Sequence, residues 1–139
     1  MKFKKLTSMF CVLICIFAVT TSAFASTYAS GQINDYLVSV SSDNGQIYVD
    51  FSVTGTGSMK EIGCESIYIY ESSSGRLVES LNENNAGMST KNARRYANVV
   101  SADCEVGVRY RVVVTIFAED SASRDTRSKT TYVTGRNTV

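Results

Sequence analysis

The sequence predicts an all-β domain, a single antiparallel β-sandwich of about seven strands. From Ile33 onward, apolar residues recur at every second position, which is the period of a strand with one buried face. Turn-forming residues separate these rows at intervals of roughly ten residues, as is typical of sandwiches. No stretch after Ile33 sustains the period of an amphipathic helix.

The first two predicted strands form the clearest hairpin in the chain. The first row is Tyr36, Val38 and Val40, and the second is Ile47, Val49, Phe51 and Val53. Between them lies Asn44-Gly45, a pair that suits a tight turn because both residues tolerate positive φ. The glycine-rich stretch 54–58 predicts a loop that ends the second strand.

The later elements follow from the same alternation. A third strand places Ile67 and Ile69 on one face and Tyr68 and Tyr70 on the other. The next predicted elements are a turn at 72–75, a short strand at 76–81, a long polar loop at 82–92 and a strand at 96–100. The longest row then follows, at Tyr110, Val112, Val114, Ile116 and Ala118. A charged turn at 119–125 leads to a last strand at 130–134.

The composition limits the chemistry that this chain can carry. Its 139 residues allow one domain, and they include no His, Pro or Trp. Without histidine, the commonest general base and every His-containing metal site are excluded. We expect a protein that is not an enzyme, with no catalytic residue, no cofactor and no metal site. Asp43-Asn44-Gly45 and Glu119-Asp120 give only a weak calcium signal, because neither has the spacing of an EF-hand loop.

Residues 1–25 have the features of a cleaved secretory signal peptide. Three lysines precede an apolar run at 9–19, and Ala23-Phe24-Ala25 provides small residues for cleavage. The run is shorter than the roughly 20 residues that span a bilayer, so no membrane anchor is expected. The predicted divisions are a signal peptide at 1–25, a disordered segment at 26–32, the sandwich at 33–134 and a tail at 135–139. The chain is expected to be secreted and extracellular.

Loss of that segment would leave a mildly acidic chain with two cysteines. Removing its three lysines leaves 11 basic against 13 acidic residues, so nucleic acid is not an expected partner. Cys64 and Cys104 would then be the only cysteines. A disulfide between them would close a loop worth roughly 4 kcal/mol of stability.

The segment 104–114 (CEVGVRYRVVV) resembles the bend and sixth strand of a fibronectin type III domain. The resemblance implies that Tyr110 is a tyrosine corner whose hydroxyl locks the bend, which contains Gly107, to upstream backbone. Residues 47–53 resemble the second strand of that family, with Phe51 where a tryptophan usually lies. The whole chain also resembles small secreted immunoglobulin-like proteins of bacteria, most of which lack an assigned function.

The fibronectin strand order and the disulfide exclude each other. That order places Cys64 and Cys104 at opposite ends of antiparallel strands. A strand of about seven residues spans roughly 23 Å, whereas a disulfide needs Cα atoms about 4.4 to 6.8 Å apart. The sequence leaves the choice open.

The outward residues of the third and sixth strands are the candidate binding residues. If the rows of Ile67 and Val112 face inward, one outer face carries the residues that we expect to bind a partner: Tyr68, Tyr70, Arg111, Val113 and Phe117. Exposed aromatic residues with an arginine are typical of interface cores. Alternatively, the tyrosines pack across strands and the 82–92 loop covers Phe117. A sugar-stacking site is less favoured, because such sites usually contain tryptophan.

We therefore expect a secreted, non-enzymatic module that binds an unknown protein or glycan at the cell surface. Two alternatives stay open: an inhibitor or toxin-like effector that inserts the 82–92 loop into an enzyme cleft, and a structural module that self-associates. Near the last turn, Arg124, Arg127 and Lys129 alternate with acidic residues. This pattern favours a solvated hairpin with weak ion pairs over an anion site.

Overall fold

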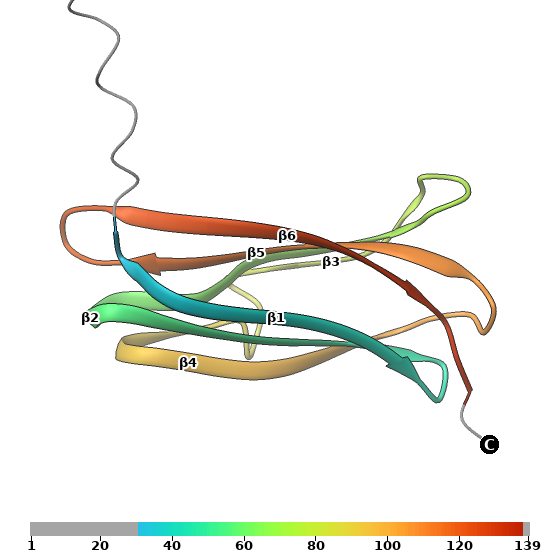
Figure 1. Ribbon diagram of the computed structural model, residues 1–139, viewed down its shortest axis with the longest axis horizontal. Coiled ribbons are helices and arrows are strands. Elements are labelled where there is room, and N and C mark those ends of the chain that lie inside the picture. The colour runs from blue at the N-terminus through green and yellow to red at the C-terminus, as the bar shows by residue number, and fades with distance from the viewer. Residues whose placement is uncertain (1–30, 138–139) are drawn as a thin grey trace, which may run out of the picture.

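A computed structural model describes residues 31–137, all of them in strands, turns and loops (Figure 1). The six strands are β1 (Ile33–Asp43), β2 (Gln46–Glu71), β3 (Leu77–Asn82), β4 (Ser89–Asp103), β5 (Arg109–Glu119) and β6 (Arg124–Thr134). The predicted signal peptide, residues 26–30 and the end of the predicted tail lie outside the described residues. Within 31–137, no helix is long and apolar enough to cross a membrane.

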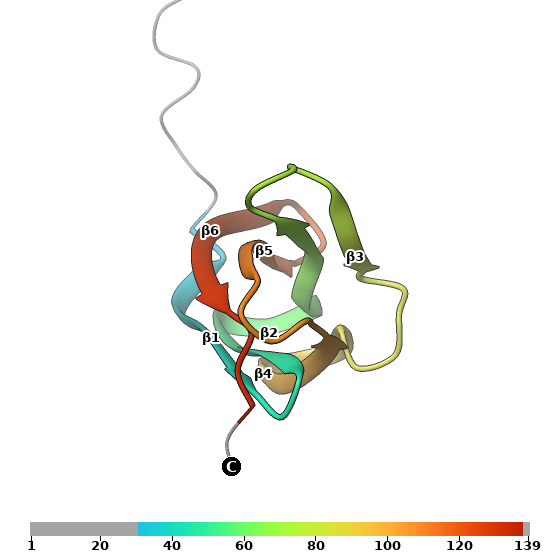
Figure 2. The same cartoon turned by 90° about the vertical axis from the view of Figure 1, so that its right-hand side faces the viewer.

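One antiparallel sheet curls around the core, and β2 organises it. The first half of β2 pairs with β1 and β4, and its second half pairs with β5 and β3. The chain reverses direction along β2, so that its two halves lie in opposite layers (Figure 1). The end-on view of Figure 2 shows the strands surrounding the core. Only β6 does not pair with β2; it attaches through β5.

The predicted seven strands are six, because the loop predicted at 54–58 is strand. This stretch continues β2, and the β2–β4 register shifts between Thr54 and Met59. A Cβ on Gly55 would lie 2.7 Å from Cγ of Met59. The bare glycine thus leaves room for Met59 to fold back into the core while the strand bends. The predicted second and third strands are therefore one strand of 26 residues.

The predicted turns are present, but two segments are shorter than expected. The charged turn predicted at 119–125 covers only 120–123, because β5 ends at Glu119 and β6 begins at Arg124. Asn44 and Gly45 have φ angles of 48° and 71°, which confirms the tight β1–β2 turn. The turn at 72–75 also lies where the sequence predicts it. The polar loop predicted at 82–92 covers only 83–88, because β4 begins at Ser89.

The alternating rows of the second, third and sixth predicted strands identify the core correctly. The inward residues of β2 and β5 that the alternation predicts are buried: Ile47, Val49, Phe51, Val53, Ile67, Ile69, Tyr110, Val112, Val114, Ile116 and Ala118. The centroids of the Phe51 ring and of the Tyr96 ring on β4 lie 6.0 Å apart. On β1, only Val38 of the predicted row is fully buried, because β1 is an edge strand. Tyr36, in the same row, is 40% exposed.

Side chains and single peptide groups, rather than a ladder, hold the edges of β1 and β6 together. The backbone N of Ile33 donates to Oδ2 of Asp125 at 3.3 Å. Farther along, Nζ of Lys129 donates to the carbonyl of Val38 at 2.8 Å. At the far end, the backbone N of Arg136 donates to Oγ of Ser42 at 2.9 Å. We call this contact between unpaired edges the β1–β6 seam.

The bend before β5 is fixed by hydrogen bonds. The hydroxyl of Tyr110, buried with 3% of its surface exposed, accepts a hydrogen bond from the backbone N of Glu105 at 2.8 Å. Gly107 has a φ of 84° and donates its N–H to the carbonyl of Gly135. The bend is thus tied both to its own strand and to the residue that follows β6.

Candidate binding face

Cross-strand rows on the outer face of β2, β5 and β6 bring tyrosines and arginines together. Tyr70 lies opposite Arg111, which lies opposite Tyr132. The guanidinium of Arg111 lies 4.4 Å from the Tyr70 ring, and that of Arg109 lies 4.9 Å from the Tyr132 ring. We call this surface the tyrosine–arginine face: Tyr68, Tyr70, Arg109, Arg111, Val113 and Tyr132.

This face is partly exposed and carries cations without matching carboxylates. Tyr68 and Tyr132 are 38% and 52% exposed, and Arg109 is also exposed. Within residues 31–137, neither Arg109 nor Arg111 forms an ion pair. Both guanidinium groups instead lie over tyrosine rings, as in cation–π contacts. The face therefore offers aromatic area and unneutralised positive charge.

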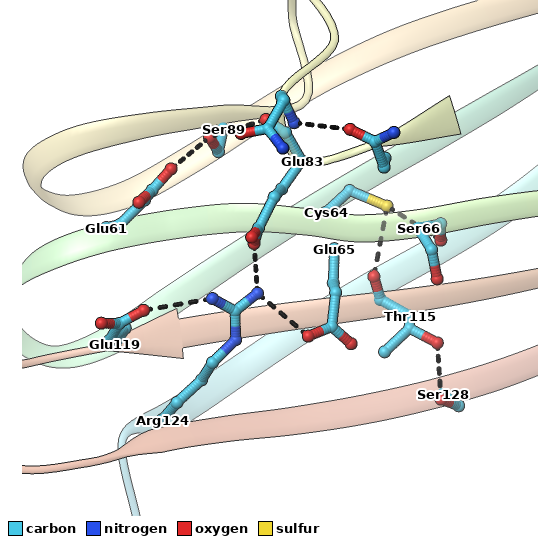
Figure 3. Close-up of polar contacts among 12 residues, drawn as sticks. Glu61, Cys64, Glu65, Ser66, Glu83, Ser89, Thr115, Glu119, Arg124 and Ser128 are labelled. Carbon is cyan, nitrogen blue, oxygen red and sulfur yellow. Dashed lines mark hydrogen bonds and ion pairs between the residues drawn. The ribbon is translucent and has the colours of Figure 1, made fainter. Parts of the chain in front are cut away.

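Phe117 lies on the same outer face but is not exposed, so it cannot contact a partner as predicted. It has no exposed surface, and the guanidinium of Arg124 lies 3.8 Å from its ring. Figure 3 shows Arg124 between three carboxylates, paired with Glu65 at 3.0 Å, Glu119 at 3.1 Å and Glu83. The observed cover is thus Arg124, which is held in a charged clamp by three carboxylates, and one of these, Glu83, begins the β3–β4 loop.

The electrostatics of the clamp keep Arg124 charged. Burial works against the charge, but the hydrogen bond and charge of Glu83, with Glu65 and Glu119, leave the pKa of Arg124 above its ordinary value. The clamp joins β2, β5, β6 and the β3–β4 loop, so Arg124 is more enclosed than a solvated hairpin residue. It also divides the outer face into a neutralised end and the cationic tyrosine–arginine face.

The β5–β6 turn gives no support to a cation site. Oδ1 of Asp120 accepts the backbone N–H groups of Ala122 and Ser123, which lower the pKa of this carboxyl. Glu119 is held by Arg124. Within the described part of the chain, no group of three or more His, Cys, Asp or Glu residues could hold a metal ion.

The β3–β4 loop is anchored to the sheet. The carbonyl of Gly87 accepts hydrogen bonds from the hydroxyl of Tyr96 at 3.0 Å and from Nδ2 of Asn98 at 2.7 Å. Met88 is fully buried in the core. A loop held in this way is less able to insert into an enzyme cleft than the long polar segment that the sequence predicts.

The two cysteines of the described chain are free thiols. Sγ of Cys64 lies 3.3 Å from the carbonyl of Thr115, to which it donates (Figure 3). Burial, opposed only in part by a hydrogen bond with the backbone of Ser66, raises the pKa of Cys64 to about 12. Cys104 lies near Oγ of Ser42, at 3.8 Å. The disulfide that the sequence left open is absent, and Cys64 is protonated at neutral pH.

Sequence reasoning missed two members of the face. Arg109 and Tyr132 have the same outward parity as Arg111 and stack on one another. Their alternation was visible, since Arg109 is two residues before Arg111. Their proximity depends on the β5–β6 register, in which Arg111 lies opposite Tyr132, and the sequence does not reveal that register.

Comparisons with known proteins assign neither family nor activity. No protein-family model matches the chain, and no curated protein matches it. Among solved structures, the apo structure of Bacteroides uniformis beta-glucuronidase 3 resembles it with a TM-score of 0.43 and 13% sequence identity. The resemblance covers 73% of this chain and only 12% of that chain.

Proposed function

We propose that this protein is an exported, non-enzymatic immunoglobulin-like module that binds another protein through the tyrosine–arginine face. The observation that carries the proposal is the gathering of exposed tyrosines and unneutralised arginines on one layer. Tyrosine and arginine are enriched at interface cores because they bury much area and combine apolar contact with hydrogen bonding. A rigid scaffold with such a face needs no further chemistry to act as a binding module.

The strand pairing supports the immunoglobulin-like part of this proposal. If the two halves of β2 count as separate strands, one layer contains β1, the first half of β2 and β4. The other layer contains β3, the second half of β2, β5 and β6. Seven segments in two antiparallel layers around one core are the arrangement of such a sandwich. The proposal of export rests on residues 1–25 of the sequence.

The charge of the face specifies the partner as a protein with an acidic surface. Arg109 and Arg111 present positive charge that no described carboxylate neutralises. Opposite potentials across an interface accelerate association and disfavour wrong partners. Binding is therefore expected to weaken as the salt concentration rises.

A matched pair of variants tests the proposal. The face variant carries Tyr68→Ser and Tyr132→Ser, and the control carries Leu37→Ser and Val99→Ser, which remove similarly exposed apolar residues from β1 and β4. Each protein is first used to capture surface proteins from the organism that produces it. The captured protein is then purified, and its binding to wild type and to each variant is measured by calorimetry. We expect the face variant to bind at least about tenfold more weakly and the control within about twofold.

Two outcomes would contradict the proposal. Equal binding by both folded variants would show that the face is not the interface. The second outcome comes from sedimentation equilibrium of the protein alone. If wild type is a dimer and the face variant is a monomer, the face binds a second copy of the chain instead.

A further inference from the structure

A groove of about 420 Å³ lies along the β1–β6 seam, beside the tyrosine–arginine face. Its β1 wall includes Val40, Ser41 and Ser42, and its β6 wall is residues 132–134. The bond from Lys129 to Val38 precedes it along the seam, and the bond from Arg136 to Ser42 ends it. We call this cavity the seam groove.

Two arginines belong to the lining of the seam groove, and none of the lining residues within 31–137 is acidic. Arg109 and Arg136 both belong to its lining. Within residues 31–137, neither of them forms an ion pair. Two like charges in one cavity repel each other, so an anion between them gains from both. Guanidinium forks also match the planar geometry of a carboxylate.

The edge of β1 supplies polar groups to the same space. The carbonyl of Val38 accepts from Lys129 instead of from a strand, which shows that its peptide group points out of the sheet toward the seam. Alternate residues of a paired edge strand point their peptide groups the same way, so Val40 and Ser42 present theirs to the seam groove. Ser41 and Thr134, whose side chains carry hydroxyls, belong to the lining as well.

The dimensions of the seam groove exclude an added β-strand. Its walls extend over three residues of each edge, which is roughly 10 Å of strand. Bonds between β1 and the β6 segment lie before and after this length. A single acidic side chain or a compact anion fits such a space, whereas an extended peptide does not.

We propose that the seam groove binds a carboxylate between Arg109 and Arg136, and that this carboxylate is an acidic side chain of the protein bound by the tyrosine–arginine face. Arg109 and Tyr132 belong to both surfaces, so a partner on the face places its edge over the groove. The source of the carboxylate rests on the proposed function; the anion site itself does not.

The site is tested with glutarate as the probe, using backbone amide NMR of the isotope-labelled protein. Glutaramide at equal ionic strength is the uncharged control, and inorganic phosphate is the competing oxyanion. The variants are Arg136→Gln and, as a matched loss of one exposed arginine on β4, Arg94→Gln. We expect saturable shifts at Ser42 and Thr134 with glutarate, a loss of affinity of at least about fivefold in Arg136→Gln, and no change in Arg94→Gln.

The same titration contains the results that would overturn the site. Shifts that do not saturate, or that are equal in Arg136→Gln and wild type, would show that the groove holds no anion. Tighter binding of phosphate than of glutarate would replace the carboxylate by a phosphate ligand.

A competition experiment separates the source of the carboxylate from the site. If glutarate displaces the partner from wild type, and Arg136→Gln weakens the partner and glutarate together, the partner supplies the carboxylate. If glutarate binds but leaves partner binding unchanged, that source is wrong and the groove takes a free small carboxylate. The folded Tyr68→Ser variant separates the two proposals. If it binds both glutarate and the partner as tightly as wild type does, the proposed function is refuted and the anion site is left intact.

Discussion

Replacing Tyr110 by phenylalanine tests whether the hydroxyl at the β4–β5 bend stabilises the fold. The hydroxyl accepts a 2.8 Å hydrogen bond from the backbone N of Glu105, and the side chain is buried. Tyr110→Phe deletes that acceptor while keeping the ring, so packing in the core is preserved. The change therefore isolates one hydrogen bond.

The expected loss follows from the position of the two partners. A net contribution of about 0.5–1.5 kcal/mol is typical of a hydrogen bond, and a buried donor left unpaired costs more. Because Glu105 itself is exposed, water can reach part of the bend, and we expect a loss of about 1 kcal/mol. In a domain of this size, that loss lowers Tm by roughly 4–8 °C.

Urea denaturation followed by fluorescence and circular dichroism measures the difference. Tyr36→Phe is the matched control, since Tyr36 is exposed and the described residues give its hydroxyl no hydrogen bond; it should change the free energy of unfolding by less than about 0.5 kcal/mol. An unchanged m value would show that only stability has moved. If Tyr110→Phe costs no more than the control, the hydroxyl does not hold the bend and the reasoning fails.

Three further predictions concern Cys64, Arg124 and Gly63. Because burial raises the pKa of Cys64 from 9.0 to about 12, the unfolded chain loses this proton at lower pH than the folded one. Above pH 9 the free energy of unfolding should therefore fall by up to about 1.4 kcal/mol per pH unit more in wild type than in Cys64→Ala; parallel urea-denaturation profiles would contradict a buried thiol. Arg124→Met should lower the free energy of unfolding by about 1–2 kcal/mol. Part of this loss should disappear in 1 M salt, where a Debye length of about 3 Å screens the repulsion among the three remaining glutamates. A loss that does not depend on salt would assign the effect to packing on Phe117. Gly63→Ala should cost about 2–3 kcal/mol, because its Cβ would lie 2.3 Å from the carbonyl oxygen of Met88, while Gly57→Ala, which meets no atom within 4 Å, should be nearly neutral in thermal unfolding.

The alternation of the sequence predicted the buried rows because a strand side chain has only two directions. Once Ile67 faces inward, its neighbours must face outward, and the tyrosine–arginine face follows from that parity. The Asn44-Gly45 turn was equally predictable, since few residue pairs allow two positive φ angles in succession. These features depend on neighbouring residues alone.

The errors arose where residues distant in the chain decide the outcome. Residues 54–58 have the composition of a loop, yet Thr54 pairs with both β1 and β4, and Met59 pairs with β4. This pairing on either side of the stretch continues the strand through it. Phe117 has outward parity, but Glu65, Glu83 and Glu119, spread over three segments, position Arg124 over its ring. The seam groove lies between the two edges of one curled sheet, and no local pattern shows that those edges meet.

Strands β1, β3, β4 and β6 each pair with a single neighbour, and β6 differs from the other three in its neighbour, which is β5 and not β2. Opening of β6 therefore leaves every ladder of β2, the element that joins both layers, in place. To detach, β6 must lose its ladder with β5, the few bonds to β1 and the ion pairs of Arg124. Its opening would expose one edge of β5 while the remaining sheet stays intact, and amide hydrogens of β6 would exchange before those of β2. Since residues 132–134 form one wall of the seam groove, an occupant there would slow this exchange, which links ligand binding to the opening of an edge strand.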